Sequence, residues 1–257
     1  MNGRRIVSLA ICIVLGLFAS TALVVLAGNT AAVSGLSRHV ATTGTDVGDC
    51  ISTDPPCRTV QYAVDVAGDD DLIKVAAGVY TGVNSYGGLA QVVYLSRTLT
   101  VRGGYTTTNW TTADPAANPT TLDAEGEGRI FYITGPISPT IENLRMTGGD
   151  ASGRGGGSLD NDAGGGVFVT QAAPTISNCV VYSSTASAVG QAYGGGLYIH
   201  QSAAIVSSSI ITGNTAGTSA TDSGFGGGVY LDYSDDATLS DNLVEGNTAS
   251  TASHGHG

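Results

Sequence analysis

The sequence predicts an all-β fold made of stacked repeats, and two features of the chain lead to this prediction. The 257 residues include 38 glycines, and only 12% are charged. Abundant turn- and strand-forming residues favour short strands joined by turns. In addition, a glycine turn followed by a strand with one aromatic residue between aliphatic neighbours recurs along the chain, which indicates a repeat architecture. The five aromatic positions are Tyr94, Tyr132, Phe168, Tyr198 and Tyr230.

The charge of the chain excludes one class of partner. The formal net charge is −11, and Lys74 is the single lysine of the sequence. Nucleic-acid binding depends on clustered basic side chains. We therefore expect no nucleic-acid partner.

Residues 1–32 are predicted to form a separate export segment. Arg4 and Arg5 precede an uncharged apolar run of 22 residues, from Ile6 to Ala27. Such a run is long enough to span a bilayer, and a basic start followed by apolar and then small residues is typical of a secretory signal. A cleaved signal peptide and a retained membrane anchor both fit. Either one predicts a secreted or cell-surface protein that meets the membrane only through this segment.

Residues 33–58 are predicted to contain a short strand at Arg38–Ala41 and a loop closed by a disulfide. Cys50 and Cys57 are seven positions apart, and in an exported protein such cysteines are expected to pair. A zinc site is not indicated, because no second cysteine pair or histidine pair lies nearby. Cys179 lies within a repeat and is expected to be a packing residue.

Residues 59–257 are predicted to form the repeat domain, which begins with one short helix. Apolar residues at 60, 63, 64 and 67 follow the helical pattern i, i+3, i+4, i+7, and Thr59 can cap the first turn. Because the end of a repeat array must be covered, this helix is predicted to be a lid. For Asp69–Asp71, a calcium site and an acidic turn that leaves the helix are both open interpretations.

Strands at Leu72–Val75 and Gly78–Tyr80 are predicted to start the stack, and five further turns follow, with aromatic residues spaced by 38, 36, 30 and 32 residues. A second strand is predicted in each of these turns, as at Thr98–Val101, Thr140–Met146 and Thr175–Val181. Aligned asparagines at 143 and 178, and at 214 and 247, are expected to satisfy backbone groups at turns. Aligned aliphatic residues are expected to fill the interior, namely Ile141, Ile176, Val206 and Leu239 in one column and Met146, Val181, Ile211 and Val244 in another.

Several phrases of the sequence resemble a known group of proteins. They are Gly-Gly-Gly-Val-Tyr-Leu at 226–231, Thr-Ile-Ser-Asn at 175–178 and Glu-Gly-Asn-Thr-Ala at 245–249. With the helix-capped start, they look like bacterial right-handed parallel β-helix repeat proteins, whose fold is shared with pectate lyases. They are also similar to polymorphic outer-membrane protein repeats. The resemblance covers about residues 38–257 and implies a right-handed parallel β-helix. It does not identify an activity, because this fold hosts many functions.

Aromatic side chains form the first candidate binding site. Strand alternation sends Val229 and Leu231 inward and Tyr230 outward. The same pattern at Tyr94, Tyr132, Phe168 and Tyr198 predicts an external aromatic ladder. This ladder is a candidate platform for an extended glycan; the alternative is a self-stacking ladder that stabilises the sheet or packs under the loops. Trp110, in the loop 105–120, is expected either to stack on a sugar ring or to fold back over the cap.

The loops 151–163, 186–193 and 216–225 are predicted to project from one edge and to form a binding surface. Asp160, Asp162 and Asp222 on these loops are candidate calcium ligands, and no other cofactor is expected. The acidic residues are scattered over different turns with no histidine among them, whereas glycosidases need converging carboxylates. The sequence therefore indicates no catalytic residue, and His200 is expected to be a surface residue. Arg129, Arg145 and Arg154 do not lie in a lyase-like motif.

These observations favour an exported, non-catalytic scaffold or adhesin that contacts surface polysaccharide or other cell-surface proteins. A polysaccharide lyase or hydrolase is the first alternative, and the passenger of an autotransporter is the second. Residues 248–257 resemble a loop between turns, which predicts that the β-helix is truncated here and continues in a longer protein.

Overall fold

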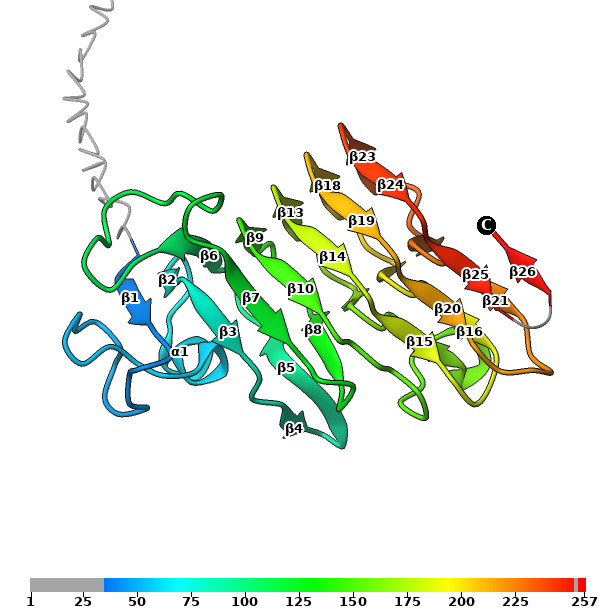
Figure 1. Cartoon of the computed structure of the whole chain (residues 1–257), viewed down its shortest axis with the longest axis horizontal. Coiled ribbons are helices and arrows are strands. Elements are labelled where there is room, and N and C mark those ends of the chain that lie inside the picture. Colours follow the sequence, from blue (N-terminus) through cyan, green and yellow to red (C-terminus); the bar gives the residue numbers. More distant parts are fainter. Residues whose placement is uncertain (1–34, 252–253) are drawn as a thin grey trace, which may run out of the picture. The chain divides into compact units, whose positions relative to one another are not determined.

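The computed structural model describes residues 35–251 and 254–257, which belong to one compact unit. This part of the chain is a β-solenoid of about seven turns with one short α-helix (Figure 1). The predicted all-β repeat fold is therefore confirmed. The export segment predicted at residues 1–32 lies outside the described residues. Within the described ranges, no helix has the length and apolar character needed to cross a membrane.

Three long sheets run along the stack, and every described strand pair in them is parallel except the antiparallel pair β4–β5. Sheet 1 consists of β1 (Ser37–Val40), β2 (Leu72–Ala76), β6 (Thr100–Tyr105), β9 (Thr140–Glu142), β13 (Thr175–Ser177), β18 (Ile205–Ser207) and β23 (Thr238–Ser240). Sheet 2 consists of β3 (Gly78–Tyr80), β7 (Thr120–Asp123), β10 (Arg145–Thr147), β14 (Val180–Tyr182), β19 (Ile210–Thr212) and β24 (Leu243–Glu245). Sheet 3 consists of β4 (Asn84–Tyr86), β5 (Leu89–Leu95), β8 (Arg129–Thr134), β12 (Val167–Thr170), β17 (Leu197–His200) and β22 (Val229–Asp232).

Two smaller sheets are formed by the loops that were predicted to project from one edge. Their parallel pairing confirms that successive loops lie beside one another. The 3₁₀ turn η1 (Ser158–Asp160) precedes β11 (Asp162–Ala163) in the chain. Sheet 4 consists of β15 (Thr185–Ser187), β20 (Thr215–Gly217) and β25 (Thr248–Ser250). Sheet 5 consists of β11 (Asp162–Ala163), β16 (Ala192–Tyr193), β21 (Gly224–Phe225) and β26 (Gly255–His256).

The second strand predicted in the later turns is wrong as a single strand. In the turn at Thr140–Met146, β9 and β10 belong to different sheets, and Asn143 between them has a left-handed φ of 60°. Ile141 and Met146 are five residues apart, so a continuous strand would point them to opposite faces. The break at Asn143 lets both side chains enter the interior, where both are fully buried. Asn178, Ser208 and Asp241 hold the same conformation in the next three turns.

The predicted aliphatic columns line the interior except in the last turn, where Leu239 and Val244 are 38% and 48% exposed. Ile176 pairs in register with Ile141 and Val206, and Val181 pairs with Met146 and Ile211. Cys179 is buried in the same core, as expected for a packing residue.

The predicted asparagine column at 214 and 247 is a ladder of side-chain amides. The Asn214 Nδ2 donates to the Val181 carbonyl and to the Asn247 Oδ1, each at 3.0 Å. The Asn214 Oδ1 accepts from the Ser184 amide at 3.1 Å, and Asn214 is fully buried. Asn214 therefore satisfies backbone groups, because a buried polar group without a partner is destabilising.

The glycine runs turn the chain from the loops into sheet 3. Gly164, Gly194 and Gly226 open these runs with φ near 60°, a conformation that glycine adopts without steric cost. The next glycine is needed for space: a Cβ on Gly165 would lie 2.2 Å from the Thr185 carbonyl oxygen.

The predicted cap helix is α1 (Val60–Val66). Thr59 is its N-cap, and its side chain accepts a hydrogen bond from the Tyr62 amide. All four predicted apolar residues of the helix lie in the hydrophobic core. The Gln61 Oε1 accepts from the Tyr94 amide at 2.6 Å, so α1 also satisfies a backbone donor of β5.

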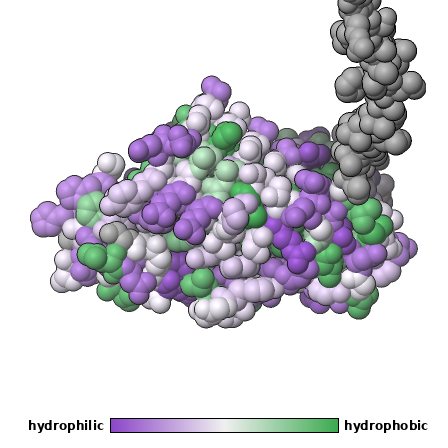
Figure 2. Space-filling model, turned by 180° about the vertical axis from the view of Figure 1, so that it is seen from behind, coloured by the Kyte–Doolittle hydropathy of each residue, from purple (hydrophilic) through white to green (hydrophobic). Residues whose placement is uncertain are grey.

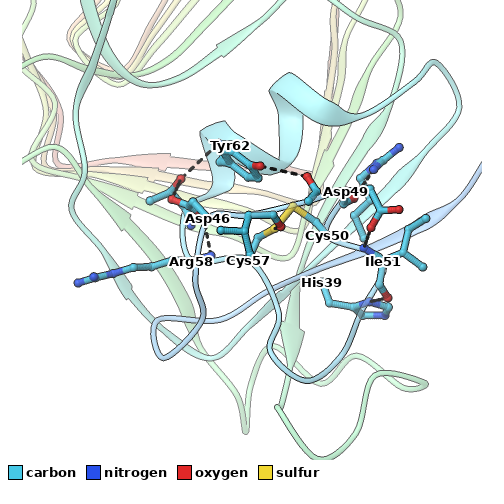
Figure 3. Close-up of a disulfide and its surroundings, with 12 residues drawn as sticks. His39, Asp46, Asp49, Cys50, Ile51, Cys57, Arg58 and Tyr62 are labelled. Atoms are coloured by element: carbon cyan, nitrogen blue, oxygen red, sulfur yellow. Dashed lines mark hydrogen bonds between the residues drawn. A yellow bond between two sulfur atoms is a disulfide. The ribbon is translucent and has the colours of Figure 1, made fainter.

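The predicted disulfide joins Cys50 and Cys57 beside α1 (Figure 3). Nearby, Asp71 is buried and forms an ion pair with Arg38 at 2.6 Å. Burial alone would raise the pKa of Asp71, but hydrogen bonds from Gly68, Arg38 and Leu36 bring this pKa below its ordinary value. In the stretch Asp69–Asp71, Asp71 therefore fixes β1 and the turn after α1, as expected for an acidic structural turn.

Candidate functional site on the outer face of sheet 3

A column of stacked rings runs along the outer face of sheet 3, as the sequence predicts. We define the aromatic ladder as Tyr86 together with the five predicted rings. Tyr86 lies on β4, and the Gly87–Gly88 turn that pairs β4 with β5 is the sequence signal that would have found it. Successive ring centroids lie 5.0, 5.7, 4.8, 5.3 and 5.9 Å apart in the order Tyr86, Tyr94, Tyr132, Phe168, Tyr198, Tyr230.

The stacking determines which ring surface a ligand can reach. Neighbouring rings are within 22° of parallel, so each inner ring has both faces covered by the next rings. A sugar cannot stack on a face that is already covered. Ring edges and phenol hydroxyls are what the inner part of the ladder offers to solvent.

The ladder is not exposed along its whole length, which corrects the expectation of an external platform over five turns. Phe168 and Tyr198 are only 2% and 1% exposed, and they pack with Ala163 and Tyr193 of sheet 5. The loop 151–163 passes so close that a Cβ on Gly156 would lie 2.7 Å from the Phe168 ring. The predicted alternative, packing under the loops, therefore holds at these two turns, whereas Tyr94, Tyr132 and Tyr230 are half-buried.

Arg129 fixes the loop 151–163, which covers Phe168, through hydrogen bonds to the backbone of this loop. Its side chain is fully buried, and it donates from Nε to the Ala163 carbonyl at 3.0 Å and from Nη2 to the Gly155 carbonyl at 2.6 Å. The guanidinium also lies 5.0 Å from the centre of the Phe168 ring. Burial lowers the pKa of Arg129 to about 10. Arg129 therefore acts as an internal anchor.

The three candidate calcium ligands have separate surroundings. Asp162 is buried and accepts hydrogen bonds from the backbone amides of residues 153, 154 and 155 and from the Ser187 hydroxyl, at 2.5–3.0 Å. These donors occupy the carboxylate oxygens that a cation would need. Asp160 is exposed in η1, and Asp222 accepts from hydroxyls of its own loop. Among the described residues, no group of three or more His, Cys, Asp or Glu side chains gathers in a way that could hold a metal ion.

A hydrogen-bonded group at the far end of the ladder was not found from the sequence. The Asp232 Oδ2 lies 2.9 Å from the His200 Nδ1 and accepts from the Tyr198 hydroxyl at 2.6 Å. His200 and Asp232 are paired in register on β17 and β22, one turn apart. Burial, and then Asp232, strongly raise the pKa of Tyr198. The repeat alignment carries the signal, because it places residue 232 directly beside residue 200.

Trp110 is half-buried and packs against the first turns of the stack. Its ring lies 4.8 Å from the His39 ring, and its carbonyl accepts from the Lys74 ammonium at 2.9 Å. Trp110 therefore folds back onto β1 and β2, and the predicted contact with a sugar stays a prediction. On the face seen in Figure 2, hydrophobic and hydrophilic residues are interspersed.

Comparison with known proteins identifies the class of the chain. Residues 130–255 match the family model described as a right handed beta helix region. Residues 130–255 are therefore a right-handed β-helix region, and the described chain as a whole is a β-solenoid of about seven turns. No curated protein and no solved structure matches the chain.

Proposed function

We propose that this protein is an exported, non-catalytic scaffold or adhesin that contacts glycans through ring edges of the aromatic ladder. The observation that carries the proposal is the pair Tyr94 and Tyr132. Their rings stack on neighbouring turns at 5.7 Å, both are half-buried, and neither hydroxyl has a hydrogen-bond partner within the described residues. Two unbonded hydroxyls on adjacent turns suit a linear polymer that lies along the stack and binds these two turns in the same way.

The net charge of −11 narrows the class of glycan. An acidic surface repels polyanions over the distance at which charges are felt. We therefore expect neutral glycans to bind better than glycans rich in carboxylates or sulfates. Export of the protein, through residues 1–32, is part of the same proposal.

A polysaccharide lyase or hydrolase is the second candidate, and the Asp232–His200 pair is the observation that favours it. A carboxylate that orients an imidazole is an arrangement used in acid–base catalysis. Glycoside hydrolysis in its common form needs two carboxylates, one on each side of the scissile bond. Among the described residues, Asp232 is the single carboxylate in contact with His200, so this pair supplies only one of the two. We therefore place binding ahead of catalysis.

One experiment separates the two candidates. The purified protein is incubated with a panel of neutral and acidic polysaccharides, with and without calcium, and both bound polymer and released products are measured. The scaffold predicts retention of at least one neutral glycan with no new reducing ends or unsaturated sugars. Product release that disappears in His200→Ala would establish the enzyme, and an absence of binding to the whole panel would refute the glycan contact.

A further inference from the structure

A separate hollow of about 420 Å³ lies between the start of α1, β3 and β5. Its floor is apolar, because Val60, Tyr80 and Val92 line it and all three are buried. Val79 on its wall is 57% exposed, which leaves apolar surface uncovered. A concave site with an apolar floor and a few polar groups at the rim is the usual form of a small-molecule pocket.

The positively charged side chain of Arg58 lies at the rim of this pocket. The Arg58 side chain is exposed and has no hydrogen bond or ion pair within the described part of the chain. The backbone of Arg58 is nevertheless fixed, because its amide donates to the Asp46 Oδ1 at 2.8 Å and its neighbour Cys57 is bonded to Cys50. Figure 3 shows the Arg58 side chain pointing away from the disulfide. The protein therefore fixes the backbone of Arg58 beside the apolar floor, and its unpaired guanidinium is part of the pocket lining.

The neighbouring carboxylate limits the charge that the pocket can accept. The Asp46 oxygens accept from the amides of Arg58 and Thr59 and from the Thr59 hydroxyl, all within 2.9 Å. These bonds keep the Asp46 charge at the rim, where it would repel a second negative charge on a ligand. We therefore expect a ligand with a single negative charge to pair with Arg58 better than a ligand with two.

We propose that this pocket binds a small organic monocarboxylate with an apolar body. The carboxylate would pair with the Arg58 guanidinium, which matches its planar geometry. The apolar body would cover Val79 and the floor, and the exposed hydroxyls of Thr42 and Thr81 lie at the same rim. This site is distinct from the aromatic ladder, so it goes beyond the glycan contact proposed above and is tested independently of it.

The test uses benzoate and its uncharged analogue benzamide as probes of the purified full chain. Binding is followed by NMR titration of the methyl groups of Val60, Val79 and Val92. We expect benzoate to shift these methyl signals and benzamide to bind at least about tenfold more weakly, because it lacks the charge-assisted bond. Equal affinity for the two probes, no saturable binding of benzoate, or shifts that avoid these methyl groups would each overturn the proposal.

Two variants and a control assign the effect to the pocket. Arg58→Gln removes the charge without loss of a structural contact, and we expect it to weaken benzoate binding at least about tenfold. Val79→Asp adds a carboxylate to the wall and should abolish benzoate binding. Arg145→Gln, at an exposed arginine on β10, should bind benzoate like the wild type. Unchanged affinity in Arg58→Gln, or an equal loss in Arg145→Gln, would contradict the assignment.

Discussion

Replacing Asn214 with alanine is expected to destabilise the β-helix by about 3 kcal/mol. Asn214 is fully buried. Its Oδ1 accepts from the backbone amide of Ser184 at 3.1 Å, and its Nδ2 donates to the Val181 carbonyl at 3.0 Å. Alanine would remove the side-chain partner of both backbone groups in a place that water does not reach. An unsatisfied buried group costs roughly 1–3 kcal/mol, and two such groups give the magnitude.

Two related variants separate burial from hydrogen bonding. Asn247→Ala removes a similar amide that is only half-buried, where water can replace it, so we expect a loss of about 1 kcal/mol. The loss of stability in Asn214→Ser should lie between those of the two alanine variants. Ser184 occupies the matching position of the preceding turn and accepts from the Gly149 amide, so a serine can replace part of the hydrogen bonding there. Urea unfolding followed by circular dichroism measures all three. A stability of Asn214→Ala within about 0.5 kcal/mol of the wild type would refute this reasoning.

Three further predictions concern the turns, the covering loop and the cap. Gly165→Ala should destabilise the protein by about 2 kcal/mol or more, because its Cβ would meet the Thr185 carbonyl, whereas Gly190→Ala, with nothing within 4 Å, should lie within about 0.5 kcal/mol of the wild type in urea unfolding. Asp162→Ala leaves the loop amides of Gly153 and Gly155 without their acceptor, so limited proteolysis followed by mass spectrometry should cut the loop 151–163 faster than in the wild type; an unchanged rate would contradict its structural role. Burial lowers the pKa of His39 below its ordinary value of 6.5. The unfolded chain then binds the proton more readily, so the stability that His39 contributes is complete above about pH 6.5 and is lost as the pH falls toward the folded-state pKa. Thermal melts between pH 7.5 and 5.5 should show this decline, and a His39→Gln variant with the same pH slope would argue against it.

Much of the fold could be predicted from the sequence, because the same residue types recur at matching positions of successive repeats and so show how the turns align. The helical spacing of apolar residues at 60, 63, 64 and 67 predicted α1, and the recurring aromatic positions predicted the ladder. The break at Asn143 was not predicted, although the odd spacing between Ile141 and Met146 requires it. A strand-like stretch hides such a corner because both of its halves look extended.

The candidate site was harder to predict, because it depends on contacts between distant turns. The burial of Phe168 depends on how the loop 151–163 folds, and that loop is fixed by Arg129 and Asp162 through contacts with backbone atoms. Such contacts leave no local pattern in the sequence. The Asp232–His200 pair is different, because register across one turn would have revealed it.

The central claim, that glycans bind at ring edges of the aromatic ladder, is tested most directly by removing two hydroxyls. The double variant Tyr94→Phe/Tyr132→Phe keeps the stacked rings, and Tyr182→Phe on β14 serves as the matched control. Isothermal titration with the neutral glycan that binds best should show at least about tenfold weaker affinity for the double variant, since two hydrogen bonds are lost, and wild-type affinity for the control. Equal affinity in the double variant and the wild type would contradict the account.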